Sequence, residues 1–159
     1  YCFGLQHSLF RQRENCNLSY AGDITCMDCW NALEEHPDAQ LIDVRTSAEW
    51  IFVGFPVLDR IGKATLMVEW QQYPAMQVNS DFVSAAVEAL DAAGADKNAR
   101  IYTLCRSGVR SISAAQALTQ AGYGSVYNVL GGFEGNPNET GHRGTVSGWK
   151  HDGLPWKQQ

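Results

Sequence analysis

The chain alternates short apolar runs with helical segments, and this alternation limits the possible folds more than any other feature. Apolar strands separated by helices are typical of a parallel sheet covered on both faces, so we expect an α/β fold. In such sheets ligands bind outside the carboxyl ends of the strands. Strands are predicted at 41–44, 101–104 and 126–129, and helices at 25–35, 47–52, 110–121 and from a cap at Asn79 to Ala93.

Residues that favour helix ends support these boundaries. Thr25 can cap the first predicted helix, and Asn79 can cap the third. Gly94 and Gly122 follow the two later helices, at the position where glycine commonly ends a helix.

Cys105 directly follows the second predicted strand and lies shortly before the last predicted helix. A helix N-terminus and inward-pointing loop N–H groups stabilise an anion at such a place. Gly108 allows the loop to curl, and Arg106 and Arg110 add positive charge. These surroundings can lower the pKa of a cysteine thiol by several units from about 8.5 and favour the nucleophilic thiolate.

A simpler interpretation of Cys105 is a buried cysteine that ends a strand. Cysteine often behaves as a small core residue, and a bare strand–cysteine–turn pattern would favour that interpretation. Two arginines within five positions of Cys105 instead favour a site for an anionic substrate or covalent intermediate.

The composition agrees with one small enzyme domain. With 159 residues the chain can bury a substantial core. Its formal net charge of −5 disfavours nucleic acid or an anionic membrane as the partner, and no apolar run or signal-peptide pattern indicates membrane insertion. Five cysteines, an odd number, disfavour a disulfide framework, and a reducing cytoplasm suits a catalytic thiolate. Neither a metal nor a cofactor is expected.

Several motifs occur together and in order, and their combination is far more specific than any one of them. These segments are Cys-Arg-Ser-Gly-Val-Arg-Ser at 105–111, Asp-Val-Arg at 43–45 with Glu49-Trp50, Asn-Val-Leu-Gly-Gly at 128–132, and Gly-Leu-Pro at 153–155. Through them the chain resembles the rhodanese family of sulfurtransferases over about residues 22–156, with 105–111 as the active loop.

This resemblance implies a three-layer α/β/α fold with a central parallel sheet of about five strands. It assigns residues 21–159 to the domain and leaves residues 1–20 as a poorly ordered extension. It also implies that Cys105 takes a sulfane sulfur from thiosulfate or a persulfide donor, carries it as Cys–S–S⁻ and passes it to a thiophilic acceptor. The expected partners are a small anionic donor and a thiol acceptor, which could be a protein persulfide carrier.

The same resemblance assigns roles within the loop. Backbone N–H groups would hold the charge of the persulfide, and the two arginine side chains would hold the oxygens of the donor. The implied substrate-binding residues are Arg106, Ser107, Gly108, Val109 and Arg110, with Asp43, Arg45 and Ser111 in support. Asp43 could equally serve a turn, and we expect Gly131 and Gly132 to supply unusual backbone angles beside the site.

The length of the loop separates two chemistries. Related dual-specificity phosphatases share the fold and have five residues between cysteine and arginine, whereas four residues separate Cys105 from Arg110. The tighter ring fits a sulfur atom better than a phosphate. A phosphatase or arsenate reductase, and a non-catalytic sulfur-carrier or binding module, remain the alternatives to a sulfurtransferase.

Parts of the chain differ from the family pattern. The segment 54–70 lacks the usual turn, so no family residue is assigned there. A polar, Gly-rich insert at 135–149 is expected beside the pocket as a lid or docking loop, and His142 and Arg143 within it either bind an anionic donor or are solvated.

Two smaller clusters have competing interpretations. Cys26 and Cys29 form a C-x-x-C pair that could indicate metal or redox chemistry, but helical spacing and the lack of further ligands favour core packing. Trp70, Tyr73 and Met76 form an aromatic patch that either packs at the rim of the core or lines the acceptor channel.

Overall fold

A computed structural model of the chain describes residues 19–159. The expected N-terminal extension therefore lies outside the described residues, except for Ser19 and Tyr20. The Tyr20 side chain is buried against the sheet and its hydroxyl donates a hydrogen bond to Asp23 Oδ1 at 2.9 Å. The described fold thus already includes Tyr20.

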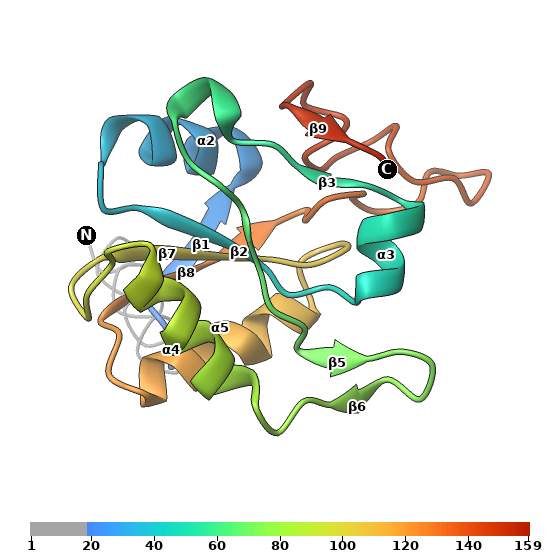
Figure 1. Cartoon of the computed structure of the whole chain (residues 1–159). Coiled ribbons are helices and arrows are strands. Elements are labelled where there is room, and N and C mark those ends of the chain that lie inside the picture. The colour runs from blue at the N-terminus through green and yellow to red at the C-terminus, as the bar shows by residue number, and fades with distance from the viewer. Residues whose placement is uncertain (1–18) are drawn as a thin grey trace, which may run out of the picture.

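Five parallel strands form the central sheet, in the order β1-β8-β7-β2-β4 (Figure 1). Their bounds are β1 Gly22–Thr25, β2 Gln40–Asp43, β4 Leu66–Met67, β7 Arg100–Leu104 and β8 Ser125–Leu130. Because all five strands are parallel, their carboxyl ends meet at one edge of the sheet. The strand β7 occupies the centre and brings Cys105 to that edge.

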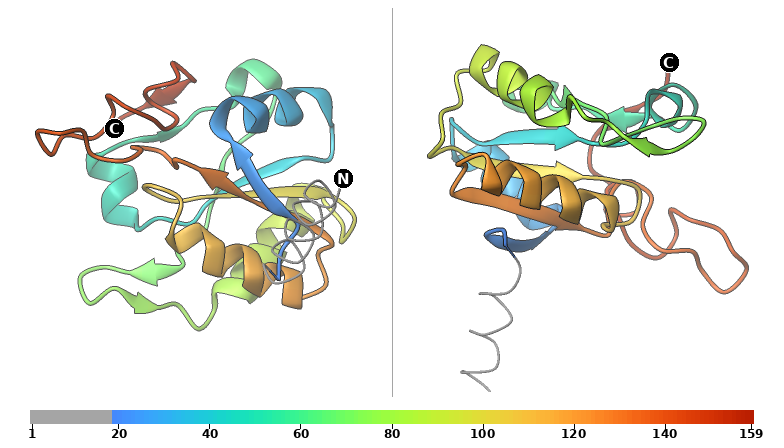
Figure 2. Two further views of the ribbon diagram at one scale, coloured as in Figure 1. Left: turned by 180° about the vertical axis from the view of Figure 1, so that it is seen from behind. Right: turned by 90° about the horizontal axis from the view of Figure 1, so that it is seen from below.

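Helices cover both faces of the sheet, which gives the expected three layers (Figure 2). The helices α4 (Phe82–Ala92) and α5 (Arg110–Gln120) pack on one face, and α2 (Cys26–Glu35) packs on the other with the C-terminal segment. Adjacent residues of a strand point to opposite faces. Ile101 accordingly joins the core under α4 and α5, whereas Tyr102 joins the core under α2.

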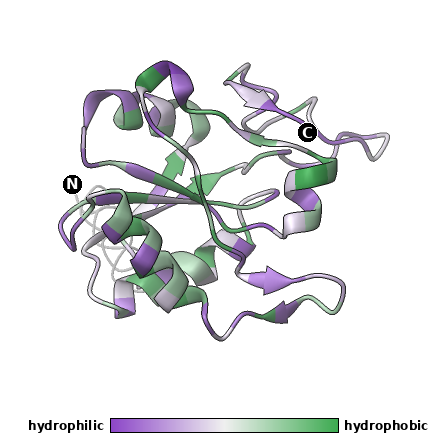
Figure 3. Ribbon diagram, in the orientation of Figure 1, coloured by the Kyte–Doolittle hydropathy of each residue, from purple (hydrophilic) through white to green (hydrophobic). Residues whose placement is uncertain are grey.

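The hydropathy pattern explains why the inner strands take the central positions. The residues of β2 and four of the five residues of β7 are buried. In Figure 3 the arrowheads of β1 and β8 in the central sheet are hydrophobic, the outer helices mix both characters, and the β5–β6 hairpin outside the sheet is mostly hydrophilic. This pattern confirms the expectation of strands buried on both faces. None of the helices in residues 19–159 has the length and hydrophobicity needed to span a membrane.

Most predicted elements are present within a residue or two of their expected bounds. Thr25 caps α2 and accepts a hydrogen bond from Asp28 N at 3.1 Å, and α3 spans Ser47–Phe52 as predicted. Gly94 and Gly122 follow α4 and α5 with positive φ angles of 78° and 107°.

The predicted cap at Asn79 is wrong. The helix α4 begins at Phe82, with Asp81 as its cap residue. Asn79 instead forms a turn before the helix: its Oδ1 accepts from Asp81 N at 3.0 Å, and its Nδ2 donates to Glu69 O at 3.0 Å. An asparagine can bond its own chain two residues on, and this local turn competes with capping.

Several short elements carry too few residues to be predicted. The edge strands β1 and β4 have four and two residues, and two small antiparallel pairs lie outside the main sheet. The pairs are β3 (Phe55–Pro56) with β9 (Trp156–Lys157), and β5 (Gln71–Gln72) with β6 (Gln77–Val78). A single 3₁₀ turn, η1, spans Asp59–Ile61 in the described chain.

The packing of α2 gives a test of the fold. We expect Leu33→Ala, at a fully buried position, to lower the free energy of unfolding by about 2–5 kcal/mol through lost burial and a cavity. The control is Met27→Ala on the same helix, where the side chain is 44% exposed, and its effect should stay within about 0.5 kcal/mol. Urea denaturation followed by circular dichroism measures both; equal losses would contradict the described packing.

Candidate active site

Cys105 lies directly after β7, at the carboxyl edge of the sheet, and only 1% of its surface is exposed. Its Sγ atom accepts a hydrogen bond from the Gly108 backbone N–H at 3.1 Å and lies 3.2 Å from Ser111 Oγ. The helix α5 begins at Arg110, so its N-terminus follows the same loop. Partial positive charge from the loop and the helix therefore surrounds the sulfur.

The turn after β8 holds the loop through backbone hydrogen bonds. Phe133 N donates to Cys105 O at 2.8 Å, and Arg106 O accepts from Glu134 N at 2.9 Å and Gly135 N at 3.1 Å. At Gly132, whose φ is +60°, a Cβ atom would collide with the Cys105 carbonyl and lie 2.6 Å from the Arg106 carbonyl carbon. Gly132 was predicted to supply an unusual backbone angle. The structure adds a second reason for glycine at this position, because only glycine permits the close approach of the two backbones.

Gly108, in the loop, also lies too close to the turn after β8 to carry a side chain easily. Its φ is +99°, and an added Cβ would lie 3.3 Å from both Val129 O and Gly131 N. The positive φ lets the Gly108 N–H point at the cysteine sulfur, as the sequence pattern predicts.

A buried polar layer lies beneath Cys105. Ser111, predicted as a supporting residue, contacts Cys105 Sγ and also bonds Asn128 Oδ1. Asn128 donates through Nδ2 to Gly108 O and to Asp23 Oδ1, both at 3.1 Å. Ser111 and Asn128 are fully buried. The chain thus places two uncharged, hydrogen-bonded side chains, Ser111 and Asn128, under the sulfur.

A cavity of about 390 Å³ opens above Cys105. Its lining combines the loop with residues from α3 and from the β5–β6 hairpin. Arg106 is exposed, Val109 is 70% exposed, and Ser107 is half-buried at this mouth. The lining residues are Glu49, Met76, Cys105, Arg106, Ser107, Val109 and Arg110.

Arg110 forms a bidentate ion pair with Glu49 of α3. The nitrogen–oxygen distances are 2.7 Å and 2.9 Å, and each side chain is 19% exposed. Burial raises the pKa of Glu49, but the hydrogen bonds and charge of Arg110 outweigh it and bring the pKa below its ordinary value. The pair is therefore ionised at neutral pH. Its carboxylate partly neutralises the arginine that the sequence assigned to an anionic donor.

Asp43 and Arg45 form a second ion pair, which is fully buried behind the loop. Arg45 Nη2 lies 2.6 Å from Asp43 Oδ2 and donates to Gly54 O at 2.7 Å. The Arg45 guanidinium also stacks 4.2 Å from the centre of the Phe133 ring. The ion pair thus packs against the side chain of Phe133, the residue whose backbone N–H bonds Cys105 O.

The insert at 135–149 packs beside the loop. Gly148 and Gly135 approach so closely that a Cβ on Gly148 would lie 2.6 Å from Gly135 N. A second cavity of about 440 Å³ lies between the insert and the start of α2, where Cys26 lines it, and shares Ser107 with the first. Arg143 bonds Gly135 O, and His142 bonds Thr140 Oγ1 at 2.9 Å. Neither residue is part of the lining above Cys105.

The two smaller clusters divide between core and site. Cys26 and Cys29 are buried in the core under α2; burial is the main cause that raises the pKa of Cys26 to about 12 and the pKa of Cys29 well above its ordinary value. Trp70 packs edge-on against Phe82 at 5.1 Å, whereas Met76 lines the cavity above Cys105. The aromatic patch is thus split between core and cavity.

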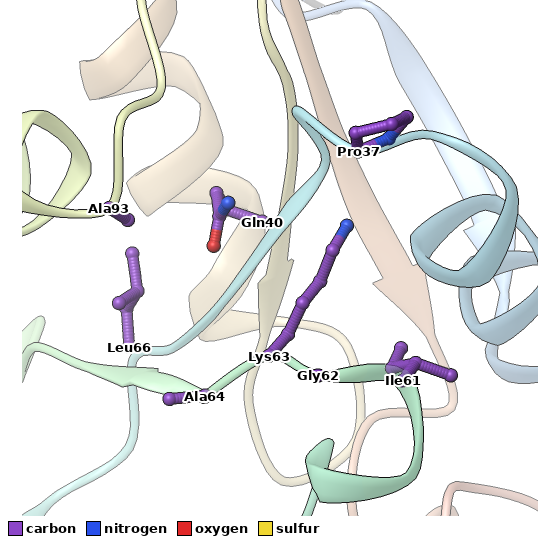
Figure 4. A pocket seen from close by; sticks show the side chains of 8 residues that line it. All are labelled: Pro37, Gln40, Ile61, Gly62, Lys63, Ala64, Leu66 and Ala93. Atoms are coloured by element: carbon purple, nitrogen blue, oxygen red, sulfur yellow. The ribbon is translucent and has the colours of Figure 1, made fainter.

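A further cavity, of about 480 Å³, lies near the amino end of β2, away from Cys105 (Figure 4). Its one ammonium group is already used: Lys63 Nζ donates to His36 O and Ala39 O, both at 2.7 Å. These bonds tie the segment after η1 to the end of α2. This cavity therefore offers no free charged group for a ligand.

Two residues of the site were not identified as such from the sequence. Glu49 and Asn128 both lie in motifs quoted for the family resemblance, but neither received a role. Glu49 is 61 positions from Arg110, and Asn128 is 17 positions from Ser111, so no local spacing connects them. The only sequence signal for a role of Glu49 and Asn128 in the site was their position in these family motifs.

Comparison with known proteins places this geometry in a family. The Rhodanese-like domain family matches residues 27–136. The chain is 38% identical to the "Uncharacterized protein RP600 homolog" of Rickettsia rickettsii, over 85% of this chain and 96% of that protein. It superposes on the crystal structure of Rv0390 from M. tuberculosis with a TM-score of 0.79 and 43% identity, over 88% of this chain and 99% of that chain.

A more distant structure supports the fold alone. The solution structure of the polysulfide-sulfur transferase homodimer from Wolinella succinogenes is 19% identical, with a TM-score of 0.51 over 94% of this chain and 90% of that chain. The α/β/α architecture and the five-stranded parallel sheet agree with these relatives. On the family match and the shared fold together, the chain belongs to the rhodanese-like domain family.

Proposed function

We propose that this protein is a sulfurtransferase that carries a sulfane sulfur on Cys105. Membership of the rhodanese-like family supports a role of the sulfurtransferase type or a related one. The observation that carries the finer proposal is the surroundings of Cys105 Sγ, which accepts the Gly108 N–H at the base of a cavity containing Arg106 and Arg110. Preorganised donors around a sulfur favour its anionic forms.

The reaction has two displacement steps. The Cys105 thiolate attacks the outer sulfur of thiosulfate, a new S–S bond forms, and the sulfur–sulfur bond of the donor breaks to release sulfite. The product is Cys105–S–S⁻. An acceptor thiolate then attacks the outer sulfur of this persulfide, takes it as R–S–S⁻ and restores the Cys105 thiolate. Each step conserves charge and needs no further oxidant.

The charged groups at the cavity suit an anionic donor. Arg106 is exposed at the mouth, and Arg110 keeps N–H groups beyond the two that bond Glu49. We infer that Arg106 first attracts the donor and that Arg110 binds its oxygens near the sulfur. Burial lowers the pKa of Arg110, but Glu49, Cys105 and Asp43 together raise it, so the guanidinium stays charged.

We infer that the acceptor is a thiol, and that a protein persulfide carrier can serve. Val109 is 70% exposed and Met76 is 36% exposed, and both line the cavity that holds Cys105. These apolar side chains beside the cavity offer a contact surface to a protein acceptor. The three cysteines of the described chain are free thiols, which agrees with a reducing cytoplasmic location.

Persulfide formation gives the direct test. After exposure to thiosulfate, we expect the peptide containing Cys105 to gain the mass of one sulfur atom, because Arg106 and Arg110 line the cavity at this thiol. Cys29 is fully buried, and Cys26 lines the second cavity, which neither arginine lines. Peptide mass spectrometry without reduction measures the gain. The buried thiols of Cys26 and Cys29 are internal controls in the same digest. Sulfur on the controls but not on Cys105, or full activity in Cys105→Ser, would refute the proposal.

The Glu49–Arg110 pair gives a second test. If Arg110 binds the donor, Arg110→Gln should raise KM for thiosulfate roughly tenfold or more, since hydrogen bonds to charged groups contribute about 1.5–3 kcal/mol. Glu49→Gln should leave KM unchanged or lower it, because the guanidinium is then freer. Arg143→Gln, in the insert and outside the cavity lining, is the matched control. Equal losses in the Glu49 and Arg110 variants would indicate a purely structural pair.

The length of the loop predicts that phosphate esters are poor substrates. Only four residues separate Cys105 from Arg110, so the ring of N–H groups is small for a phosphate. We expect no hydrolysis of p-nitrophenyl phosphate above the level of the Cys105→Ser variant, measured by release of nitrophenolate. Cysteine-dependent hydrolysis would favour the phosphatase alternative.

A further inference from the structure

Ser111 lies beneath Cys105, and its hydroxyl group has one hydrogen to donate but two possible acceptors. Ser111 Oγ lies 3.2 Å from Cys105 Sγ and within hydrogen-bond distance of Asn128 Oδ1. A hydroxyl group carries a single donor hydrogen. Because Ser111 and Asn128 are fully buried and Cys105 is 1% exposed, bulk water cannot supply the missing bond. The serine must therefore donate to one of the two groups at a time.

The orientation of the Asn128 amide is fixed by its other contacts. Its two N–H hydrogens point to Gly108 O and Asp23 Oδ1, each at 3.1 Å from Nδ2. A flipped amide would set its oxygen against these two acceptors. The Asn128 oxygen therefore faces Ser111, and since this oxygen can only accept, it competes for the serine hydrogen.

The competition depends on the charge of the sulfur. With a neutral thiol, Cys105 S–H can donate to Ser111 Oγ while Ser111 donates to Asn128, and every group is paired. A thiolate needs the serine hydrogen for itself. The hydroxyl must then turn away from Asn128, whose buried oxygen loses its donor, and an unpaired buried acceptor is unfavourable.

We propose that Asn128 is a positioning residue that controls the stability of the Cys105 thiolate by competing for the hydroxyl hydrogen of Ser111. This relay consists of Asn128 on β8, Ser111 on α5 and the sulfur of Cys105. It gives the sulfur a second hydrogen-bond contact, which can change, in addition to the bond from the Gly108 N–H. A persulfide sulfur next to Cβ carries no proton and little charge, so the serine can return to Asn128 once the outer sulfur is loaded. That last consequence rests on the proposed function; the competition itself does not.

Charged groups around the sulfur come from several elements. Arg106 and Arg110 lie in the loop and at the start of α5, Glu49 lies on α3, and Asp43 lies at the end of β2 paired with Arg45. Asp23 of β1 lies beyond Asn128. None of these charged residues is replaced in the variants below. The Asn128 variants also remove the bonds to Asp23 Oδ1 and Gly108 O, and the Ser111→Ala background separates that effect from the relay through the serine.

The test is the pH profile of Cys105 alkylation by iodoacetamide on the unloaded chain, read by mass spectrometry of the Cys105 peptide. Asn128→Leu, which keeps the branching of the side chain at Cγ, should move the midpoint to lower pH by roughly half to one unit, up to a tenfold change in the thiolate-to-thiol ratio. Ser111→Ala should move it to higher pH. In the double variant Asn128 has no serine to act through, so the profile should match that of Ser111→Ala alone.

Thr103→Val is the matched control, because it also removes a buried polar contact next to α5: Thr103 Oγ1 bonds Ser111 O at 3.0 Å without reaching the sulfur. Its midpoint should stay at the wild-type value. Asn128→Ala serves as a second variant if Asn128→Leu does not fold. A midpoint that is unchanged or raised in the Asn128 variants, or a shift that persists in the Ser111→Ala background, overturns the proposal. Sulfur loading is not part of the assay, so this failure is distinguishable from failure of the sulfurtransferase proposal.

Discussion

The contact between the loop after β7 and the turn after β8 is the constraint on which the rest of the site depends. Two carbonyls of the loop, at Cys105 and Arg106, accept N–H groups from 133–135, and Gly132 has no room for a side chain. Main chain therefore packs on main chain, and the loop conformation is set by backbone geometry. The direction of the Gly108 N–H toward the sulfur follows from that conformation.

Once the loop is fixed, its charges can be arranged separately. Glu49 pairs Arg110 above the sulfur, and Asp43 pairs Arg45 behind the Phe133 ring. The Glu49–Arg110 pair joins segments 61 positions apart, whereas Asp43 and Arg45 are two positions apart. In both cases the buried charge is tolerated because it is paired. The contact closest to the sulfur from below is neutral, through Ser111. The charged side chains thus lie at the cavity, while hydrogen bonds from uncharged groups control the stability of the Cys105 thiolate.

The sequence predicts the elements whose residues are adjacent in the chain, but it does not predict contacts between residues that are far apart in the chain. The loop from Cys105 to Arg110, the strand β7 and the helix α5 are adjacent in the chain, so apolar runs and helix ends identify them. The pairing of Glu49 with Arg110 spans 61 positions and depends on where α3 packs. The false cap at Asn79 has a local cause, because an Asx turn and an N-cap use the same side-chain oxygen. A two-residue strand such as β4 is defined by its partner β2 and has no period of its own.

The position of the insert explains how this chain can depart from the family pattern without disturbing the site. The main chain leaves the core after Phe133, whose N–H bonds Cys105 O, and returns at Trp149, whose N–H bonds Gly132 O at 2.8 Å. Both residues are fully buried, and Trp149 Nε1 is further held by Pro155 O at 2.8 Å. The segment between them is anchored at each end to the turn that supports Cys105. Its length and polarity can therefore vary beside the cavity while the backbone contact under the loop keeps its geometry.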